Sequence, residues 1–244
     1  MAVNQYIDLK VNKRRIFRRK IDTGARLCLL CDAALDDFDE LLCNACVTDL
    51  PANQDACPVC ARPDTYNHHC VSCINHAPPY FKILALYRYE YPVNRLIQYA
   101  KFHSRLDIAR FLGQQMAVLF GDSRSQPECL VPVPLHAMRL ADRGYNQALE
   151  IANSISRSLK IPVQSGCVQR ITAARAQMEL SAKQRKRNVR GAFAIVRSVL
   201  PEYRHVAIVD DVVTTGATVT ELAKLLKGSG VTRVDVWACA RAAL

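Results

Sequence analysis

Eight of the eleven cysteines in this 244-residue chain stand in four Cys-x-x-Cys pairs, and this spacing constrains the fold more than any other feature of the sequence. A Cys-x-x-Cys turn can direct two sulfurs at one metal ion, and a tetrahedral zinc site takes four thiolates. Four pairs therefore predict two closed zinc sites, which are structural because no coordination position is left open for chemistry. The pairs are Cys28/Cys31, Cys43/Cys46, Cys57/Cys60 and Cys70/Cys73.

The simplest pairing of the four turns is sequential, although the spacing also allows an interleaved arrangement. About 50 polar residues build little core, so metal binding would supply much of the folding energy of this segment. One Cys-x-x-Cys pair could instead serve thiol redox chemistry, but four at near-regular spacing favour zinc. Three nearby histidines, His68, His69 and His76, could replace a cysteine, but the cysteine set is already complete. Sequential pairing puts Cys28, Cys31, Cys43 and Cys46 around one ion and Cys57, Cys60, Cys70 and Cys73 around the other.

Charge divides the chain into three segments. Residues 1–27 carry eight basic and two acidic side chains, residues 28–76 carry one and eight, and residues 77–244 carry 24 and 12. Blocks of opposite sign usually belong to separate structural units. We therefore predict a basic N-terminal extension at 1–27, a double zinc ribbon at 28–76 and a larger domain at 80–244. The basic larger domain favours a polyanionic partner, such as nucleic acid or a phosphate-rich small molecule.

The N-terminal sequence shows no secretory pattern, because the basic run Lys10–Lys20 is not followed by an apolar stretch. No apolar run reaches the roughly eighteen residues of a membrane-spanning helix. We therefore expect a soluble cytoplasmic protein without membrane insertion. Disulfides are disfavoured in the cytoplasm. The basic run fits either a nucleic-acid arm or a disordered tip. The remaining cysteines, Cys129, Cys167 and Cys239, stand in apolar contexts and are expected to be buried.

From residue 80 onward, strand and helix patterns alternate along the chain. This alternation predicts an α/β domain with a largely parallel sheet and helices on both faces. In such a sheet, ligands collect at the carboxyl ends of the strands. Predicted strands cover 80–91, 130–133, 162–168, 191–196, 204–210 and 231–240, and predicted helices cover 92–102, 106–120, 135–159 and 218–227.

The most informative stretch is Val206–Thr218, VAIVDDVVTTGAT. An apolar strand ends in two adjacent carboxylates, Asp210 and Asp211, and a Thr-Thr-Gly turn then leads into a helix. Successive backbone N–H groups, hydroxyls and a helix N-terminus suit a phosphate monoester. The carboxylates before them can hold ribose hydroxyls or a magnesium ion. The stretch therefore predicts a site for a phosphorylated ribose, the alternative being a buried strand with a polar turn.

This stretch resembles the 5-phosphoribosyl-1-pyrophosphate (PRPP) signature of type I phosphoribosyltransferases at every position of the consensus. The resemblance implies that the two aspartates engage the ribose hydroxyls and that the loop holds the 5′-phosphate. In that family a nucleophile displaces pyrophosphate from the anomeric carbon through an oxocarbenium-like transition state. Magnesium is held on the diphosphate, and no protein nucleophile is needed. The implied PRPP-binding residues are Asp210, Asp211, Val212, Val213, Thr214, Thr215, Gly216, Ala217 and Thr218.

Two further sets of basic and amide side chains could contact pyrophosphate or nucleic acid. If 135–159 is one helix, Arg139, Arg143, Asn146 and Gln147 share one face, which suits a polyphosphate or a nucleic-acid backbone; the alternative is a solvated face. His136 begins this helix and is expected to be a structural hydrogen bonder. Residues 170–193 carry seven basic side chains and one acidic one, and fit a cationic loop over an anionic ligand or a disordered solvated run. The basic residues of this second set are Arg170, Arg175, Lys183, Arg185, Lys186, Arg187 and Arg190.

The order of these motifs looks like that of the ComF family of competence-associated proteins. The motifs are the paired cysteines, PVPLH and RGYNQA in 132–148, NVRGAF in 188–193 and IVDDVVTTGAT in 208–218. The resemblance covers about residues 28–240, so residues 1–27 lie outside it. It implies a zinc ribbon with two structural zinc ions, joined to a phosphoribosyltransferase-type domain that binds PRPP with magnesium. It also implies a role in natural transformation, with handling of incoming single-stranded DNA.

Three functional hypotheses follow from the sequence. The chain could transfer a phosphoribosyl group, although no segment that would select an acceptor is recognisable. It could handle DNA and bind PRPP or a nucleotide without turnover. The excess of basic residues in 77–244 and the family resemblance favour this hypothesis. It could also be an adaptor whose acidic zinc ribbon docks a helicase or another DNA-uptake protein.

Overall fold

The computed structural model describes residues 27–35, 40–103, 105–122, 125–172, 191–196 and 202–243. The chain forms two compact units, Met1–Leu50 and Pro51–Leu244. The division between them falls between the second and third Cys-x-x-Cys pairs, inside the segment 28–76, so each unit contains two pairs. Within the described part of the chain, no helix combines the length and the apolar character needed to cross a membrane.

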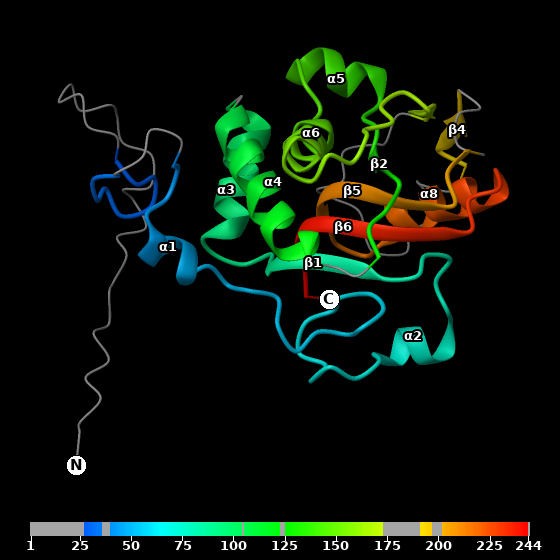
Figure 1. Cartoon of the computed structure of the whole chain (residues 1–244), viewed down its shortest axis with the longest axis horizontal. Helices are drawn as coiled ribbons and strands as arrows, with labels where there is room; N and C mark the ends of the chain where they lie inside the picture. The colour runs from blue at the N-terminus through cyan, green and yellow to red at the C-terminus, as the bar shows by residue number, and fades with distance from the viewer. Residues whose placement is uncertain are drawn as a thin grey trace. The chain divides into compact units, whose positions relative to one another are not determined.

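A four-stranded sheet forms the centre of the larger unit. Its strand order is β1-β6-β5-β2, and all three neighbouring pairs are parallel (Figure 1). Because adjacent parallel strands run the same way, their carboxyl ends meet at one edge, where β5 delivers the two aspartates. The strands are β1 (Ile83–Arg88), β2 (Cys129–Pro132), β5 (His205–Val213) and β6 (Arg233–Arg241).

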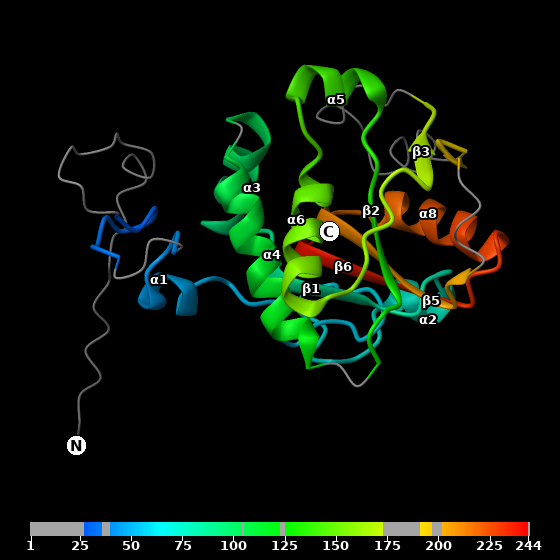
Figure 2. The same ribbon diagram turned by 45° about the horizontal axis from the view of Figure 1, so that its top comes forward.

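Helices cover both faces of this sheet. Helices α4 (Leu106–Gly121) and α6 (Gln147–Leu159) pack on one face, and α3 (Val93–Phe102) packs against α4. Helix α8 (Ala217–Gly228) lies on the other face (Figure 2). Buried strands of a parallel sheet read as continuous apolar runs, and β5 follows this rule through Val209 before its carboxylates begin.

The predicted helix 135–159 is wrong, because the chain forms two helices there. Helix α5 (Ala137–Arg143) ends at Gly144, whose φ of 80° stops the helix in the left-handed region. Helix α6 then begins at Asn146, whose side-chain oxygen accepts a hydrogen bond from the N–H of Ala148 at 3.0 Å. A glycine in the left-handed region ends a helix, and an asparagine N-cap begins the next one.

The remaining elements are short. Strands β3 (Val168–Arg170) and β4 (Phe193–Ile195) form a separate antiparallel pair. The predicted strand 162–168 is wrong except at its last residue, where β3 begins, and the predicted strand 191–196 is shorter than expected. Helices α1 (Asn44–Thr48) and α2 (Val71–Asn75) each begin directly after a cysteine of the four-cysteine clusters. The parallel sheet with helices on both faces confirms the predicted α/β class.

Candidate functional site

The eight paired cysteines form two separate clusters, and within each the four sulfurs lie within 4.8 Å of one another. The first is Cys28, Cys31, Cys43 and Cys46, and the second is Cys57, Cys60, Cys70 and Cys73. This is the sequential pairing, so the interleaved alternative is wrong. The sulfurs of Cys31 and Cys43 lie 3.6 Å apart and those of Cys60 and Cys70 lie 3.5 Å apart, which is the spacing of thiolates around one ion.

Backbone hydrogen bonds prepare one thiol of each cluster for metal binding. Burial raises the pKa of Cys57, but N–H groups of Cys60, Cys70 and Val59 outweigh it and lower this pKa to about 7. The same balance, with N–H groups of the first cluster, lowers the pKa of Cys28 to about 7. The thiolate is the form that binds metal, so the donor set and its spacing fit two structural zinc ions. His68, His69 and His76 are exposed and belong to neither cluster.

The second cluster is part of the core of the larger unit. Its buried members Cys57, Cys60 and Cys70 pack in the same apolar cluster as β5 and α8 residues. Two backbone hydrogen bonds tie its surroundings to β1, from Ile83 N–H to Val59 O at 2.8 Å and from Asn53 N–H to Leu86 O at 3.0 Å. This cluster is therefore a component of the sheet domain.

The PRPP-like stretch forms the predicted strand, loop and helix at the carboxyl edge of the sheet. Strand β5 continues through both aspartates to Val213, beyond the predicted end at residue 210. Gly216, with a φ of 76°, is the N-cap of α8. The hydroxyl of Thr215 accepts a hydrogen bond from Ala217 N–H at 3.4 Å. The nine predicted binding residues, Asp210 to Thr218, thus lie in one continuous turn of chain, with the loop side chains half-buried.

The two aspartates differ in their surroundings. The N–H of Asp211 donates to Oδ1 of Asp210 at 2.9 Å. Burial raises the pKa of Asp210 to about 8, and repulsion from Asp211 adds to this increase. One carboxylate of the pair is therefore held with a tendency to bind a proton or a cation.

Lys101 contacts the carboxylate pair and is a candidate site residue that was not predicted from the sequence. It stands in the last turn of α3, and its Nζ lies 2.7 Å from Oδ2 of Asp211. Burial lowers the pKa of Lys101, but the attraction of Asp211 and Asp210 outweighs burial and raises it. The lysine is therefore charged, and it partly neutralises the carboxylate pair. No local sequence pattern predicts the contact between Lys101 and Asp211, because α3 and β5 are far apart in the sequence.

The break between α5 and α6 changes the roles of the second predicted set. Asn146 caps α6 and donates from Nδ2 to Val133 O at 3.0 Å, so its amide holds the helix to the end of β2. Gln147 is 3% exposed and accepts a hydrogen bond from Nη1 of Arg143 at 2.7 Å. The single shared helix face is therefore wrong. Arg139 remains half-buried on α5, and His136 is the N-cap of that helix, as a structural hydrogen bonder should be.

Arg170 is the described member of the cationic 170–193 segment that faces the site. Its guanidinium is buried and lies 5.5 Å from the centre of the Phe193 ring. Burial lowers the pKa of Arg170, repulsion from Arg139 lowers it further, and attraction to Asp210 raises it. Two arginines are thus within electrostatic reach of each other, and one of them is within reach of Asp210. The other basic residues of the segment, Arg175, Lys183, Arg185, Lys186, Arg187 and Arg190, lie outside the described residues.

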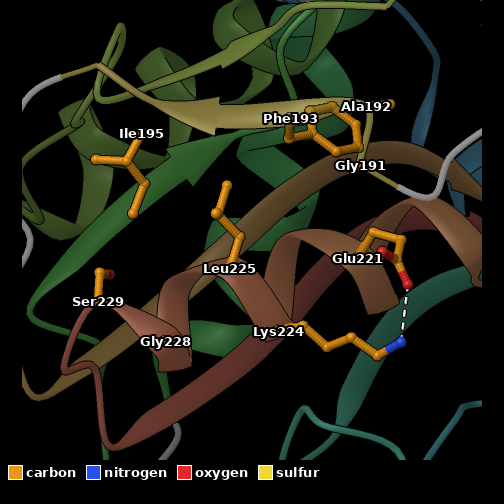
Figure 3. A pocket seen from close by; sticks show the side chains of 9 residues that line it. All are labelled: Gly191, Ala192, Phe193, Ile195, Glu221, Lys224, Leu225, Gly228 and Ser229. Carbon is orange, nitrogen blue, oxygen red and sulfur yellow. Dashed lines mark hydrogen bonds and ion pairs between the residues drawn. The ribbon is translucent and has the colours of Figure 1, made fainter.

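A pocket also lies between β4 and the second half of α8, and it is separate from the PRPP-like loop. Figure 3 shows its lining, in which Phe193 and Ile195 face Leu225 and Glu221 pairs with Lys224 at 2.8 Å. None of the residues 210–218 lines it. The candidate site is therefore defined by the carboxyl edge of β5, Lys101 and the loop before α8.

Comparison with known proteins identifies a zinc-ribbon segment and relatives of the whole chain. Residues 25–74 match the family model of the double zinc ribbon domain. The chain is similar to Competence protein F of Haemophilus influenzae, with 35% identity over 88% of this chain and 96% of that protein. It is similar to the same extent, 35% over 88% and 96%, to DNA utilization protein YhgH of Escherichia coli.

Among solved structures, 53% of the chain aligns with 25% of a glutamine PRPP amidotransferase from B. subtilis complexed with ADP and GMP. The sequence identity is 22% and the TM-score is 0.37. The interpretation of the site therefore rests on its own residues.

Proposed function

Because the chain belongs to the Competence protein F family, we propose that it handles incoming single-stranded DNA in the cytoplasm during natural transformation. We also propose that it binds PRPP with magnesium, or a related phosphorylated ribose, at the end of β5. The observation that carries the ligand proposal is the continuous arrangement of Asp210, Asp211 and the 214–216 loop before α8. Adjacent carboxylates beside a helix N-terminus combine acceptors for ribose hydroxyls with N–H donors for a phosphate.

The contact of Lys101 with Asp211 supports the proposal that the aspartates bind ribose hydroxyls and that magnesium binds the diphosphate. Its ammonium group already occupies Oδ2 of Asp211, so the aspartates are better suited to ribose hydroxyls than to holding the metal alone. Oδ1 of Asp210 already accepts the N–H of Asp211, and its other carboxyl oxygen can accept a hydrogen bond from a ribose hydroxyl. When bound, magnesium would neutralise the diphosphate of PRPP.

A ligand-dependent thermal shift tests the binding site. Ligand at about 100 times its Kd stabilises the folded chain by about 2.7 kcal/mol, which raises Tm by about 5–10 °C for a domain of this size. Asp210→Asn combined with Asp211→Asn should abolish the shift produced by PRPP with magnesium. Asp107→Asn, on the partly exposed start of α4, is the matched control and should retain the shift. An unchanged melting curve of the wild-type chain at millimolar PRPP would refute the assignment.

DNA handling is supported by the family and by the basic residues of 77–244. Binding to single-stranded DNA should weaken steeply as salt increases, because release of condensed counterions dominates such affinity. Fluorescence anisotropy with a labelled oligonucleotide at about 50 and 200 mM salt measures this. Absent or salt-independent binding would contradict the DNA proposal. A helicase or another DNA-uptake protein is the partner class that fits the acidic 28–76 segment, with seven more acidic than basic residues.

An active phosphoribosyltransferase is the second candidate function. The specific observation in its favour is Arg170, whose buried guanidinium is attracted to Asp210, since a cation there suits a departing pyrophosphate. Pyrophosphate release from PRPP, measured with and without single-stranded DNA or nucleobases, distinguishes turnover from binding. Release that is absent under every condition, together with a positive thermal shift, identifies a binding site without transferase activity.

A further inference from the structure

Arg241 connects the second cysteine cluster to the loop that follows β5. It is the last residue of β6, is 2% exposed, and stands beside Val213 in the parallel register of β5 and β6. Its Nε donates to Cys60 O at 2.9 Å. Its Nη1 donates to Val213 O at 3.1 Å and also to Thr214 O. One guanidinium therefore contacts the backbone of a cluster cysteine and of the phosphate loop.

These bonds set the direction of the loop amides. In a trans peptide the C=O and the following N–H point in opposite directions. Because the C=O groups of Val213 and Thr214 point at Arg241, the N–H groups of Thr214 and Thr215 point away from it. Two consecutive donors of the proposed phosphate site are thus oriented by a side chain that contacts no ligand. The C=O of Val213 also accepts the N–H of Ala242 at 3.0 Å, which fixes the same peptide from the chain after β6.

The charge of Arg241 needs a counter-ion. Within the described part of the chain it makes no ion pair with a carboxylate, although a buried unpaired charge is costly. A zinc ion with four thiolates carries a net charge of about −2. The second cluster with zinc bound would therefore supply the missing negative charge next to Nε, whereas a cluster of neutral thiols would not.

Tyr80 belongs to the apolar packing that includes residues of both parts. It is buried in one apolar cluster with Cys57, Cys60 and Val213. Its hydroxyl would lie 4.0 Å from a Cβ built on Gly216, the residue that turns the chain into α8. The packing beside Gly216 therefore includes Tyr80, which shares its apolar cluster with the buried cysteines of the second site.

We propose that Arg241 couples the second four-cysteine site to the phosphate loop, so that zinc bound by Cys57, Cys60, Cys70 and Cys73 holds the loop in its ligand-binding conformation. The proposal rests on the PRPP site proposed above. It assigns Arg241 as a positioning residue and gives the second zinc a role that the first zinc does not share. Coupling between two sites is reciprocal, so PRPP must tighten zinc binding at the second cluster by the factor with which zinc tightens PRPP.

The first test measures the Kd of PRPP with magnesium by isothermal titration calorimetry. Lysine keeps the charge but lacks the planar fork that reaches several carbonyls, so Arg241→Lys should weaken binding at least about fivefold. Arg88→Lys is the matched control, because Arg88 stands beside Arg241 in the register of β1 and β6 but is paired with Asp64 at 2.8 Å. It should change the Kd less than twofold.

The second test keeps Arg241 and reads zinc, so it remains decisive if Arg241→Lys does not fold. Zinc affinity is measured by competition with 4-(2-pyridylazo)resorcinol in the full chain carrying Cys31→Ser, which leaves the second cluster intact. Saturating PRPP should tighten zinc binding at the second cluster by at least about fivefold. The same titration in a chain that also carries Asp210→Asn and Asp211→Asn corrects for zinc bound by PRPP itself.

The outcomes separate the two proposals. If the wild-type chain binds PRPP, but Arg241→Lys leaves the Kd of PRPP unchanged and PRPP does not tighten zinc binding, the coupling is refuted and the PRPP site stands. If the wild-type chain does not bind PRPP, the proposed site fails and the coupling fails with it. A weaker Kd in Arg241→Lys, an unchanged Kd in Arg88→Lys and tighter zinc binding with PRPP together support the coupling.

Discussion

Replacing Lys101 tests whether the carboxylate pair depends on this ammonium group. The Lys101 and Asp211 side chains are 24% and 13% exposed, and 2.7 Å separates the charged atoms. At an effective dielectric constant of about 20, unit charges at this distance attract by about 6 kcal/mol, before desolvation is subtracted. Breaking such a pair leaves a carboxylate unpaired beside a second one. We therefore expect Lys101→Gln to lower the free energy of unfolding by about 3 kcal/mol.

Urea unfolding followed by circular dichroism measures this loss, which corresponds to a fall in Tm of about 6–12 °C. Arg105→Gln is the matched control, because Arg105 bonds Asp107 in a more exposed pair and its loss should cost less than about 1 kcal/mol. The double variant with Asp211→Asn should recover part of the loss, giving a coupling energy of about 1–3 kcal/mol. The loss should be larger at pH 8 than at pH 5, because protonation can neutralise a carboxylate at the lower pH. A loss below about 0.5 kcal/mol, or no coupling, would refute the reasoning.

Three further predictions follow from the described contacts. Because the pKa of Asp210 is raised, the folded state holds this proton up to about pH 8, while the unfolded state releases it near pH 4. The free energy of unfolding of the wild-type chain should therefore fall as the pH rises from about 4 to about 8. Urea unfolding measures this fall, and Asp210→Asn should flatten it. Asn146→Ala removes the α6 cap and the bond to Val133, and should cost about 1–2 kcal/mol in the same assay. Elemental analysis should give about two zinc ions per wild-type chain and about one per chain in Cys31→Ser or Cys73→Ser. Only Cys73→Ser should lower the unfolding temperature of the larger unit, because the second cluster belongs to that unit.

Features whose chemistry is local could be predicted from the sequence. Each cysteine cluster is closed by two nearby turns, so the spacing indicates the eight ligands and the sequential pairing as the simplest arrangement, which the structure forms. The PRPP-like stretch likewise contains its own strand, loop and helix start, and the structure forms all three. The error at 135–159 has a local cause too, since the apolar periodicity continues across Gly144 although that glycine and Asn146 are typical of a helix end and a new start.

Features that depend on packing between distant segments could not be predicted in this way. Lys101 reaches Asp211 only because α3 ends at the same sheet edge as β5. Arg241 is the last residue of an apolar strand, and its sequence context gives no sign of its bonds to Cys60 and Thr214. Both are single basic residues, and a single basic residue is usually solvated. Clusters of charge are visible in the sequence, whereas the candidate site also contains isolated charges that become buried only when the chain folds.

The two cysteine clusters show how equal spacing can lead to unequal roles. Their sequences indicate one repeated unit, and one family model spans both. In the first cluster, however, Cys31 is exposed and Cys43 and Cys46 are only half-buried. In the second, three of four cysteines are buried in the core of the sheet domain, beside Tyr80 and Val213. Since a bound ion stabilises the residues against which its ligands pack, zinc in the second cluster would stabilise the core beside the proposed phosphate loop, and zinc in the first would stabilise the turns that carry its ligands.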